Sequence, residues 1–471
     1  MKVLLIQPNF DAHIVHPPLG LGYLAAYLEK NNHEVAIFDA TLKNASLEQT
    51  LLAIKIFLPN LVGITVLSRG HNKAREIINE IKKIFPKLPV VIGGTQVTAA
   101  PAEVMADFKA DFAVIGEGEI TLAELVSALG GKNKFSDIDG LAYREKKKIR
   151  INHKRKLIEN LDKIPFPAWH LMPPGQYRIA PILEPIHASP VAPILTSRGC
   201  PYNCSFCASN VTWQRKLRFR SPENVIGEIK LLKEKYGVKE IHFADDNFTM
   251  DTKRAEEICD RLIEENIDLP WQCPNGVRID RLPLSLLRKM KKAGCYAVGL
   301  GIESGNQKIL DKNSKNLNLK VVPQVLEDLR KVGIESYGFF ILGLPGDTKQ
   351  TINETINFAL TNPFDRVWFN LFTPYPGSPA FNNWLGNRRV GDIDWDKHDC
   401  STAVAKLRGV SGKELEKLQK AALRKFYLRP KNLFKLLVRL RPREILTLIM
   451  SRFFGKIGKP IFMLAHKFTR R

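Results

Sequence analysis

Short apolar runs alternate with longer amphipathic stretches along the first 131 residues of the chain. The apolar runs occupy residues 2–7, 35–40, 61–67, 89–94 and 111–118, and the amphipathic stretches occupy residues 19–30, 47–57 and 72–85. Strands that alternate strictly with helices form a parallel sheet that is covered on both faces. The pattern therefore predicts an α/β unit, a doubly wound parallel sheet, over residues 1–131.

Small and polar residues follow several of these predicted strands. They lie at residues 8–9, 65–68, 93–95 and 116–118. Ligands of doubly wound sheets bind outside the carboxyl ends of the strands. The glycines among these residues would let a ligand lie close to the backbone, and they fit a tight turn between strand and helix equally well.

The chain changes character over residues 132–190. A charged stretch at residues 144–156 is followed by a segment with eight prolines between Pro165 and Pro193. Proline fixes one backbone dihedral angle and lacks a hydrogen-bond donor. We therefore expect a charged and Pro-rich linker that contains a hairpin and continues as an extended connector.

The alternation resumes over residues 191–400. Apolar runs occupy residues 194–197, 240–245, 271–276, 297–303, 336–343 and 366–372, and helical patterns between them include residues 222–236, 252–265 and 348–360. Six βα units in about 180 residues suit a partial parallel barrel, smaller than the closed barrel of eight units. Catalytic groups of such a barrel lie at the carboxyl ends of its strands.

The composition is that of a globular protein. Of the 471 residues, 44% are hydrophobic and 25 are Phe, so the chain can bury substantial cores. This excludes a disordered protein and a small disulfide-linked scaffold. No uncharged apolar run reaches about 18 residues and the N-terminus is too short for a signal sequence, so we expect a cytoplasmic protein.

Positive charge is concentrated at the C-terminus. The net charge is +23, and residues 406–471 hold 19 Lys and Arg against 3 Asp and Glu. Apolar residues at helical spacing between the basic ones predict a basic amphipathic helical tail over residues 401–471. Such helices bind anionic membrane surfaces, and they pack equally well against a domain with the charged face in solvent. Nucleic acid is the weaker partner, because aromatic residues are not interleaved for base stacking.

Three of the seven cysteines fall within eight residues, which favours metal binding over disulfides. Cys200, Cys204 and Cys207 have the spacing C-x3-C-x2-C. Three thiolates this close can hold one [4Fe-4S] cluster and leave one iron open for an exogenous ligand. Zinc is the alternative, but it normally needs a fourth ligand in a paired pattern, and the other four cysteines stand alone.

This cysteine spacing at the end of a first barrel strand resembles the signature of the radical S-adenosylmethionine superfamily. The resemblance implies that the open iron binds the amino and carboxylate groups of S-adenosylmethionine. It also implies that one electron, from a donor such as flavodoxin or ferredoxin, cleaves the sulfonium to give a 5′-deoxyadenosyl radical. Such a radical abstracts hydrogen from unactivated C–H bonds.

Later strand ends agree with that resemblance. Asp245, Asp246 and Asn247 stand where the family contacts the methionine amino group, and their oxygens suit an ammonium. Asn275 and Arg278 occupy the next position on the barrel rim. Arg278 is expected either to bind the methionine carboxylate or to form a salt bridge of the rim.

Two further strand ends extend the resemblance. Glu303 and Ser304 match the element that the family uses near the ribose or the second cofactor, and Gly343 lies in the strand that flanks adenine. Tyr202 and Phe206 stand between the cysteines and are expected to shield the cluster from water.

The N-terminal unit resembles the cobalamin-binding domain that precedes the radical domain in one large subfamily. The segments that carry this resemblance are residues 17–28, 62–67, 90–98 and 113–119. It implies that Thr65, Leu67, Gly93 and Gly94 line the nucleotide tail of cobalamin.

Many cobalamin proteins supply the lower cobalt ligand from a D-x-H-x-x-G motif. Asp11 and His13 approximate this motif, but His16 stands where glycine is expected. Because members of this subfamily commonly lack the ligand, we expect Asp11 and His13 to be loop residues.

The two resemblances cover nearly all of residues 1–410 and lead to a functional hypothesis. We expect a cobalamin-dependent radical enzyme that methylates a carbon centre of a hydrophobic small-molecule or lipid substrate. A peptide, a phosphonate or a tetrapyrrole intermediate stays open as the substrate. The basic tail would bring the enzyme to the inner face of a membrane as a peripheral protein. The alternatives are oxidative cyclisation or rearrangement without methyl transfer, and a non-catalytic cobalamin or iron–sulfur sensor.

Overall fold

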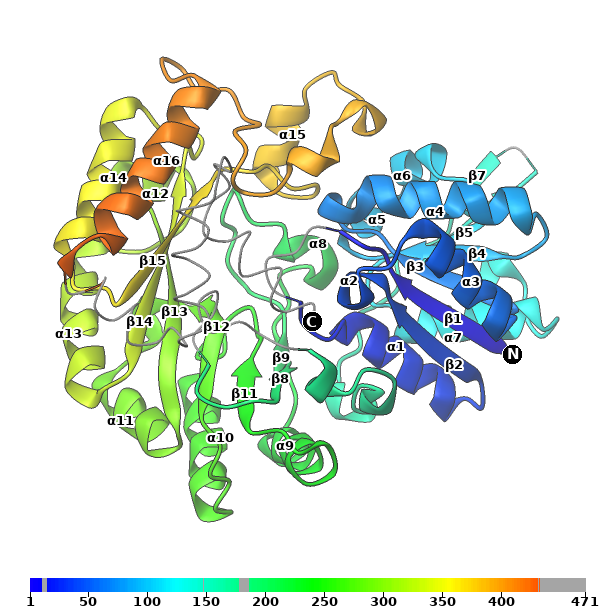
Figure 1. The fold of residues 1–471 in the computed structure, drawn as a ribbon, viewed down its shortest axis with the longest axis horizontal. Coiled ribbons are helices and arrows are strands. Elements are labelled where there is room, and N and C mark those ends of the chain that lie inside the picture. Colours follow the sequence, from blue (N-terminus) through cyan, green and yellow to red (C-terminus); the bar gives the residue numbers. More distant parts are fainter. Residues whose placement is uncertain (11–14, 147, 178–185, 431, 433–471) are drawn as a thin grey trace, which may run out of the picture.

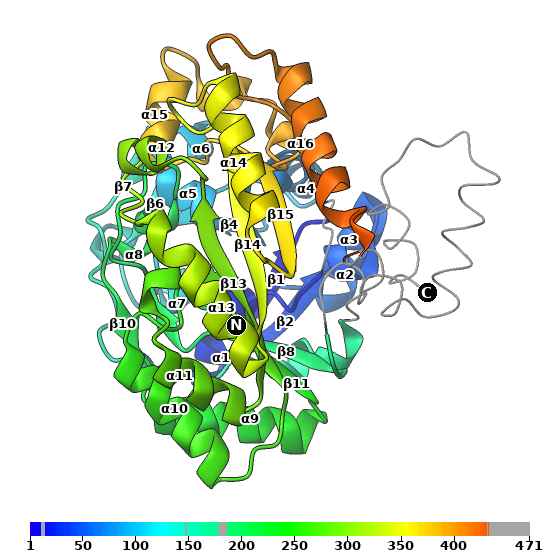
Figure 2. The same ribbon diagram turned by 90° about the vertical axis from the view of Figure 1, so that its left-hand side faces the viewer.

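The protein consists of two α/β units that lie side by side, each built on its own sheet (Figure 1). The structure is a computed structural model and describes residues 1–10, 15–146, 148–177, 186–430 and 432. The N-terminal unit is coloured blue to cyan and the second unit green to yellow. The last described helix, in orange, lies on the outer side of the second unit, as the turned view in Figure 2 also shows.

Seven strands form the first sheet, in the order β2-β1-β3-β4-β5-β6-β7. The parallel strands are β1 (Lys2–Gln7), β2 (Glu34–Asp39), β3 (Leu61–Thr65), β4 (Val90–Gly93) and β5 (Phe112–Val114). The helices between and after them are α1 (Leu19–Lys30), α2 (Ala40–Lys43), α3 (Leu47–Phe57), α4 (His71–Ile84), α5 (Thr95–Ala99), α6 (Pro101–Asp107) and α7 (Gly118–Leu129). This confirms the predicted doubly wound parallel sheet.

The apolar runs of this sheet are continuous because both faces are buried. Leu4 and Ile6 of β1 belong to one hydrophobic core, whereas Val3 and Leu5 belong to a second core on the opposite face. Successive side chains of a strand point to opposite faces, so a strand covered on both sides needs apolar residues throughout.

The hairpin expected in the linker extends the first sheet. It consists of β6 (Leu141–Glu145) and β7 (Lys148–Ile151), and β6 pairs antiparallel with β5. From residue 152 to 190 the described chain contains short 3-10 turns, at Leu161–Lys163, Trp169–Leu171 and Pro174–Gln176. Because the hairpin is hydrogen-bonded to the first sheet, we propose that the N-terminal unit ends after Ile151.

Six parallel strands form the second sheet, in the order β15-β14-β13-β12-β11-β8. The strands are β8 (Val191–Ile194), β11 (Glu240–Phe243), β12 (Trp271–Val277), β13 (Cys295–Glu303), β14 (Glu335–Leu342) and β15 (Arg366–Leu371). The helices are α9 (Pro222–Tyr236), α10 (Thr252–Glu264), α11 (Leu284–Lys292), α12 (Gln307–Lys312), α13 (Val322–Val332), α14 (Lys349–Thr361) and α15 (Pro379–Leu385). This confirms the predicted partial barrel of six βα units.

Local signals set the ends of these helices. Before α9, the side chain of Ser221 accepts a hydrogen bond from the backbone N–H of Asn224, and Pro222 occupies the first helical position. After it, Gly237 adopts a left-handed conformation with φ of +61°. Glycine enters that region without steric cost, so the helix ends at the residue before it.

The first segment of the basic tail packs against the barrel. α16 (Gly412–Tyr427) begins at the capping residue Ser411, and the Gln419 side chain donates a hydrogen bond to the backbone oxygen of Phe369 in β15, at 2.7 Å. Phe426 is fully buried. The amphipathic pattern therefore serves domain packing in this segment. The remaining predicted tail helices lie outside the described residues.

Within the described part of the chain, no helix is both long enough and apolar enough to cross a membrane.

Candidate active site

The three cysteines lie on one loop between two very short strands. β9 (Ser197–Arg198) precedes Cys200, and α8 (Ser209–Trp213) follows Cys207. β10 (Arg218–Phe219) then pairs antiparallel with β9, so residues 199–217 form a closed loop. We call this segment the cysteine loop.

The surroundings of the thiols fit the cluster. None of the three is in a disulfide, Cys204 is buried, and Cys200 and Cys207 are half-buried. Burial raises the pKa of all three thiols, that of Cys207 to about 11. The nearby cation of Lys315 opposes this rise at Cys200 and Cys204. Iron would replace the protons and hold these sulfurs as thiolates, which are the form that binds metal.

The aromatic residues between the cysteines pack against the rim and an apolar cluster. Phe206 packs against an apolar cluster that contains Leu344 and Phe372. The guanidinium carbon of Arg278 lies over the ring of Tyr202, 3.9 Å from the centroid of that ring. That these two side chains shield a cluster from water stays a prediction.

Arg278 forms the rim salt bridge that was the alternative to carboxylate binding. Its Nε and Nη2 donate to the two carboxylate oxygens of Asp280, at 2.9 and 2.7 Å. Its Nη1 and Nη2 also donate to the backbone oxygens of Lys315 and Asn316, at 2.8 and 2.6 Å. With four hydrogen bonds already formed, the guanidinium holds the rim together and has little capacity left for a ligand.

The three polar residues after β11 face different surroundings. Asp245 is buried and accepts hydrogen bonds from Ser197 and Thr196, which ties β11 to the start of the cysteine loop. Asn247 is buried and accepts the backbone N–H of Arg278 at 3.4 Å. Asp246 is exposed, and the hydroxyl of Ser209 donates to one of its oxygens at 2.7 Å. Of the three, Asp246 alone presents a carboxylate to solvent.

The other predicted rim residues also divide into exposed and packed groups. Asn275 is exposed and donates a hydrogen bond to the backbone oxygen of Ala244 at 2.7 Å. Glu303 is half-buried and forms an ion pair with the buried Lys315 at 2.8 Å. Both side chains therefore lie at the carboxyl ends of the barrel strands, where they could contact a ligand.

Ser304 and Gly343 are instead part of the packing beneath the rim. Ser304 is fully buried, and its hydroxyl lies 3.0 Å from that of Thr355 in α14. Gly343 has φ of +90°, and a side chain there would meet Leu415 of α16 at 3.0 Å. That these two residues contact S-adenosylmethionine stays a prediction.

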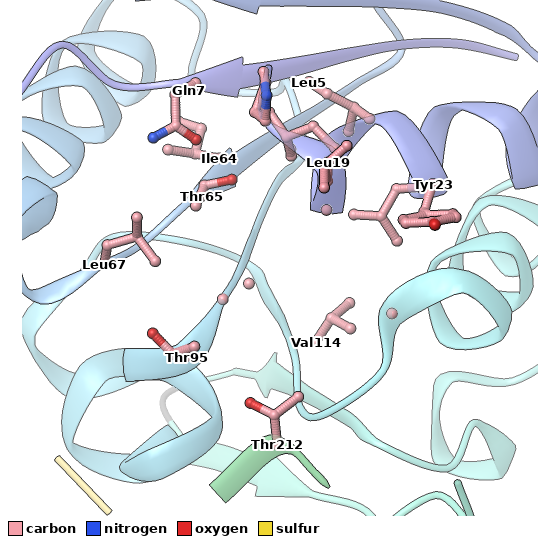
Figure 3. A pocket seen from close by; sticks show the side chains of 18 of the residues that line it. Leu5, Gln7, Leu19, Tyr23, Ile64, Thr65, Leu67, Thr95, Val114 and Thr212 are labelled. Atoms are coloured by element: carbon pink, nitrogen blue, oxygen red, sulfur yellow. The ribbon is translucent and has the colours of Figure 1, made fainter. Parts of the chain in front are cut away.

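A cavity of about 490 Å³ opens at the carboxyl ends of the strands of the first sheet (Figure 3). All four residues predicted from the cobalamin resemblance line it, namely Thr65, Leu67, Gly93 and Gly94. The second unit contributes another part of its wall, namely Leu195, Arg198, Thr212 and Trp213. The cavity is therefore shared between the two units.

Two glycines of this cavity leave the backbone open, as a large flat ligand requires. Gly20 and Gly116 both line it, and a side chain added at either position would meet no atom within 4 Å. Gly94 has φ of +109°, and a side chain there would meet the backbone oxygen of Val66 at 2.8 Å. These features fit a corrin that lies against the ends of the strands.

His16 lines the same cavity, whereas Asp11 and His13 lie outside the described residues. The His16 ring lies 6.4 Å from that of His242 in the barrel.

Sequence reasoning missed the residues through which the two units share this wall. Glu117 and Glu119 line the cavity, and both form ion pairs with Arg198. The two glutamates were visible in the run of residues 113–119 that carries the cobalamin resemblance. Their partner Arg198 could not be identified from the sequence, because it lies about eighty positions away in a strand of two residues.

Comparison with known families agrees with both units. Residues 194–359 match the Radical SAM superfamily, and residues 10–126 match the B12 binding domain.

Three relatives resemble this chain over most of its length. The uncharacterized methyltransferase PH0819 of Pyrococcus horikoshii is 35% identical over 92% of this chain and 94% of its own. The cytidylyl-2-hydroxyethylphosphonate methyltransferase of Streptomyces wedmorensis is 31% identical over 83% of each chain. The anaerobic magnesium-protoporphyrin IX monomethyl ester cyclase of Rubrivivax gelatinosus is 29% identical over 91% of this chain and 78% of its own.

A solved structure has the same fold over nearly the whole chain. It is that of the radical S-adenosylmethionine methyltransferase TsrM from Kitasatospora setae, with cobalamin and a [4Fe-4S] cluster bound. The TM-score is 0.69 at 18% identity, and the match covers 94% of this chain and 89% of TsrM.

These matches reject the two alternatives in which the site holds zinc or the protein is a non-catalytic sensor. The cysteine loop, the shared cavity and the relatives agree with one another on a [4Fe-4S] cluster, S-adenosylmethionine and cobalamin as the cofactors. The chain therefore belongs to the cobalamin-dependent radical S-adenosylmethionine enzymes.

Proposed function

We propose that this enzyme transfers a methyl group from S-adenosylmethionine, by way of cobalamin, to a carbon centre of its substrate. The observation that carries this proposal is the shared wall between the two cofactor sites. Thr212 and Trp213 line the cavity, and they belong to the helix that directly follows Cys207. Neighbouring sites suit a reaction in which both cofactors act on one substrate.

When bound, the cluster supplies electron transfer to S-adenosylmethionine and cobalamin supplies methyl carriage. The residues of the chain itself would bind the cofactors and orient them. The thiolates of Cys200, Cys204 and Cys207 would hold the cluster, while Tyr202 and Phe206 exclude water beside it.

We assign the binding of the methionine amino group to Asp246, because its carboxylate is exposed beside the cysteine loop. Asn275 and Glu303 are the other rim residues that we propose as contacts of S-adenosylmethionine. Asp245, Asn247 and Arg278 would act by fixing the loop and the rim.

We propose that Thr65, Leu67, Gly93 and Gly94 line the nucleotide tail of cobalamin. The support is their common position on the cavity wall.

A methyl group labelled with deuterium tests the transfer. The reduced holoenzyme is incubated with S-adenosylmethionine that carries a trideuterated methyl group, and the extracted cobalamin is analysed by mass spectrometry. We expect all three deuterons in the cobalamin fraction. Formation of 5′-deoxyadenosine without label in cobalamin would contradict methyl transfer and leave the radical chemistry intact.

Oxidative cyclisation is the second candidate, and the similarity to the cyclase of Rubrivivax gelatinosus favours it. It predicts the unlabelled outcome of the same experiment, because a cyclisation needs hydrogen abstraction but no methyl donor.

The substitution Cys204→Ala tests the cluster assignment. It should abolish the formation of 5′-deoxyadenosine and leave the first unit folded, because the thiols and the first sheet belong to separate units. Cys259→Ala is the matched control, since Cys259 is a free and fully buried cysteine in α10. A Cys204→Ala variant that still makes 5′-deoxyadenosine would overturn the assignment.

For the substrate class, we propose a hydrophobic or lipid molecule that the enzyme meets at an anionic membrane surface. The support is the basic amphipathic pattern of residues 433–471. Co-sedimentation with vesicles of phosphatidylglycerol and phosphatidylcholine should exceed that with phosphatidylcholine alone. A chain that ends at residue 432 should lose the difference.

A further inference from the structure

Four charged side chains lie buried where the two units meet, and we call them the interdomain clamp. They are Glu117 and Glu119 of the first unit and Arg198 and Arg218 of the second. Arg198 donates to Glu117 at 2.7 Å and to Glu119 at 2.6 Å, and Arg218 donates to Glu117 at 2.8 Å. Each of the four side chains is at most 8% exposed. Both carboxylate oxygens of Glu117 are therefore bound by arginine.

The two arginines stand at the two ends of the cysteine loop. Arg198 and Arg218 are directly opposite each other in the pairing of β9 with β10. All three cysteines lie on the segment between them. One carboxylate, that of Glu117, thus holds both ends of the loop.

The glutamates face the cavity from the other side. Glu117 and Glu119 line it together with Arg198, and they flank Gly118 at the start of α7. The Trp213 ring, also part of the wall, lies 5.6 Å from the Arg198 guanidinium and 5.8 Å from that of Arg218. The clamp therefore reaches from the cavity to the cysteine loop.

Buried charges are an expensive way to join two domains, because the desolvation of the ions offsets most of their attraction. Burial alone would lower the pKa of Arg198, but the carboxylates of Glu119 and Glu117 outweigh it and raise the pKa. The guanidinium of Arg198 thus stays ionised. Compared with an apolar contact, these ion pairs also fix the orientation of the groups that they join. The reason is that a guanidinium fixes the angle as well as the distance to a carboxylate.

We propose that Glu117 is a positioning residue through which occupation of the cavity fixes the geometry of the cysteine loop. A corrin against residues 117–119 would restrict the start of α7, and the clamp would pass that restriction to both ends of the loop. The inference rests on the two cofactor sites and holds whether the product is methylated or cyclised.

Hydrogen–deuterium exchange of the cluster-loaded full chain, with and without hydroxocobalamin, tests this coupling. We expect hydroxocobalamin to slow exchange of the amides of residues 199–217 on the order of tenfold in the wild-type protein. In Glu117→Gln the cofactor should still bind, but the slowing should fall to about twofold or less. The quantity compared is the difference made by the cofactor, which a loss of general stability would leave in place.

Glu124→Gln is the matched control. Glu124 lies on the same helix and pairs with Arg155, which belongs to the segment after the hairpin and not to the cysteine loop. This variant should keep the tenfold effect. If Glu117→Gln keeps it as well, or if Glu124→Gln loses it equally, the proposal is overturned.

A second variant decides the case if Glu117→Gln does not fold. Glu119→Gln removes the ion pair with Arg198 and leaves Glu117 bound to both arginines. In this variant we expect hydroxocobalamin to slow amide exchange of residues 199–217 by a factor between the roughly tenfold of the wild-type protein and the roughly twofold of Glu117→Gln. A slowing equal to that of the wild-type protein would overturn the proposal.

Discussion

At the scale of single residues, the cysteine loop depends on a glycine at its base. Gly199 has φ of +101°, and a side chain there would collide with the backbone oxygen of Lys216. The two ends of the loop approach each other at this point, between Arg198 and Cys200. Neither the conformation nor the space permits any other residue.

Gly199→Ala should therefore prevent the loop from closing and lower iron binding. We expect the iron content after anaerobic reconstitution to fall from about four to below one per chain. Gly237→Ala is the control, because Gly237 also has a positive φ but an added side chain meets nothing within 4 Å. Full iron occupancy in Gly199→Ala would show that the loop does not need this closure.

The sequence identified the cysteines because their chemistry depends on local spacing alone. It could not decide the role of Arg278, since two of its partners, Lys315 and Asn316, lie nearly forty residues later in the chain. The resemblance likewise placed Ser304 and Gly343 at the cofactor, but it gave no indication of their packing against α14 and α16.

At the scale of elements, α16 is anchored to the barrel by its last turn. Phe426→Ala should lower the free energy of unfolding by about 3–5 kcal/mol, because it leaves a cavity at a fully buried aromatic position. Urea denaturation followed by circular dichroism measures the change. Leu428→Ala, at a side chain that is 65% exposed, should cost less than about 0.5 kcal/mol.

The contact of α4 with the segment after α15 should weaken in acid. His71 lies 2.7 Å from Asp107 and stacks near Trp395, which also contacts His398. Burial lowers the pKa of both histidines, partly opposed by Asp107 at His71 and by Asp394 at His398. As the pH falls through about 6.5, the unfolded chain binds protons that the folded one resists, so stability declines.

Melting temperatures between pH 7.5 and 5.5 check this expectation. The double variant His71→Asn and His398→Asn should have a flatter profile than the wild-type protein. Leu428→Ala, which changes no titratable group, should keep the slope of the wild-type profile. An equal slope in all three proteins would contradict the assignment.

Element prediction succeeded where periodicity is long and both faces are buried. The strands and main helices of both sheets lie close to their predicted ranges. β9 and β10 were not predicted, because strands of two residues have no periodicity to detect. Their pairing lies beside the close approach of Gly199 to Lys216 and beside the interdomain clamp, which appear only in the folded molecule.

At the scale of the whole molecule, the two units should bind their cofactors in fixed proportion. Anaerobic reconstitution with iron, sulfide and hydroxocobalamin, followed by desalting and elemental analysis, should give about four irons and one cobalt per chain. Four irons without cobalt would mean that the cavity of the first unit does not hold a corrin.

The buried clamp also constrains how such enzymes can be recombined. A chimera that joins this N-terminal unit to a foreign barrel would leave two carboxylates in the interface without their guanidinium partners. An unpaired buried charge costs about 3–5 kcal/mol, a large part of the stability of an ordinary domain. The ion pairs therefore link two segments across the domain boundary, residues 117–119 and residues 198–218. When domains are exchanged, by evolution or by design, these two segments should be exchanged together.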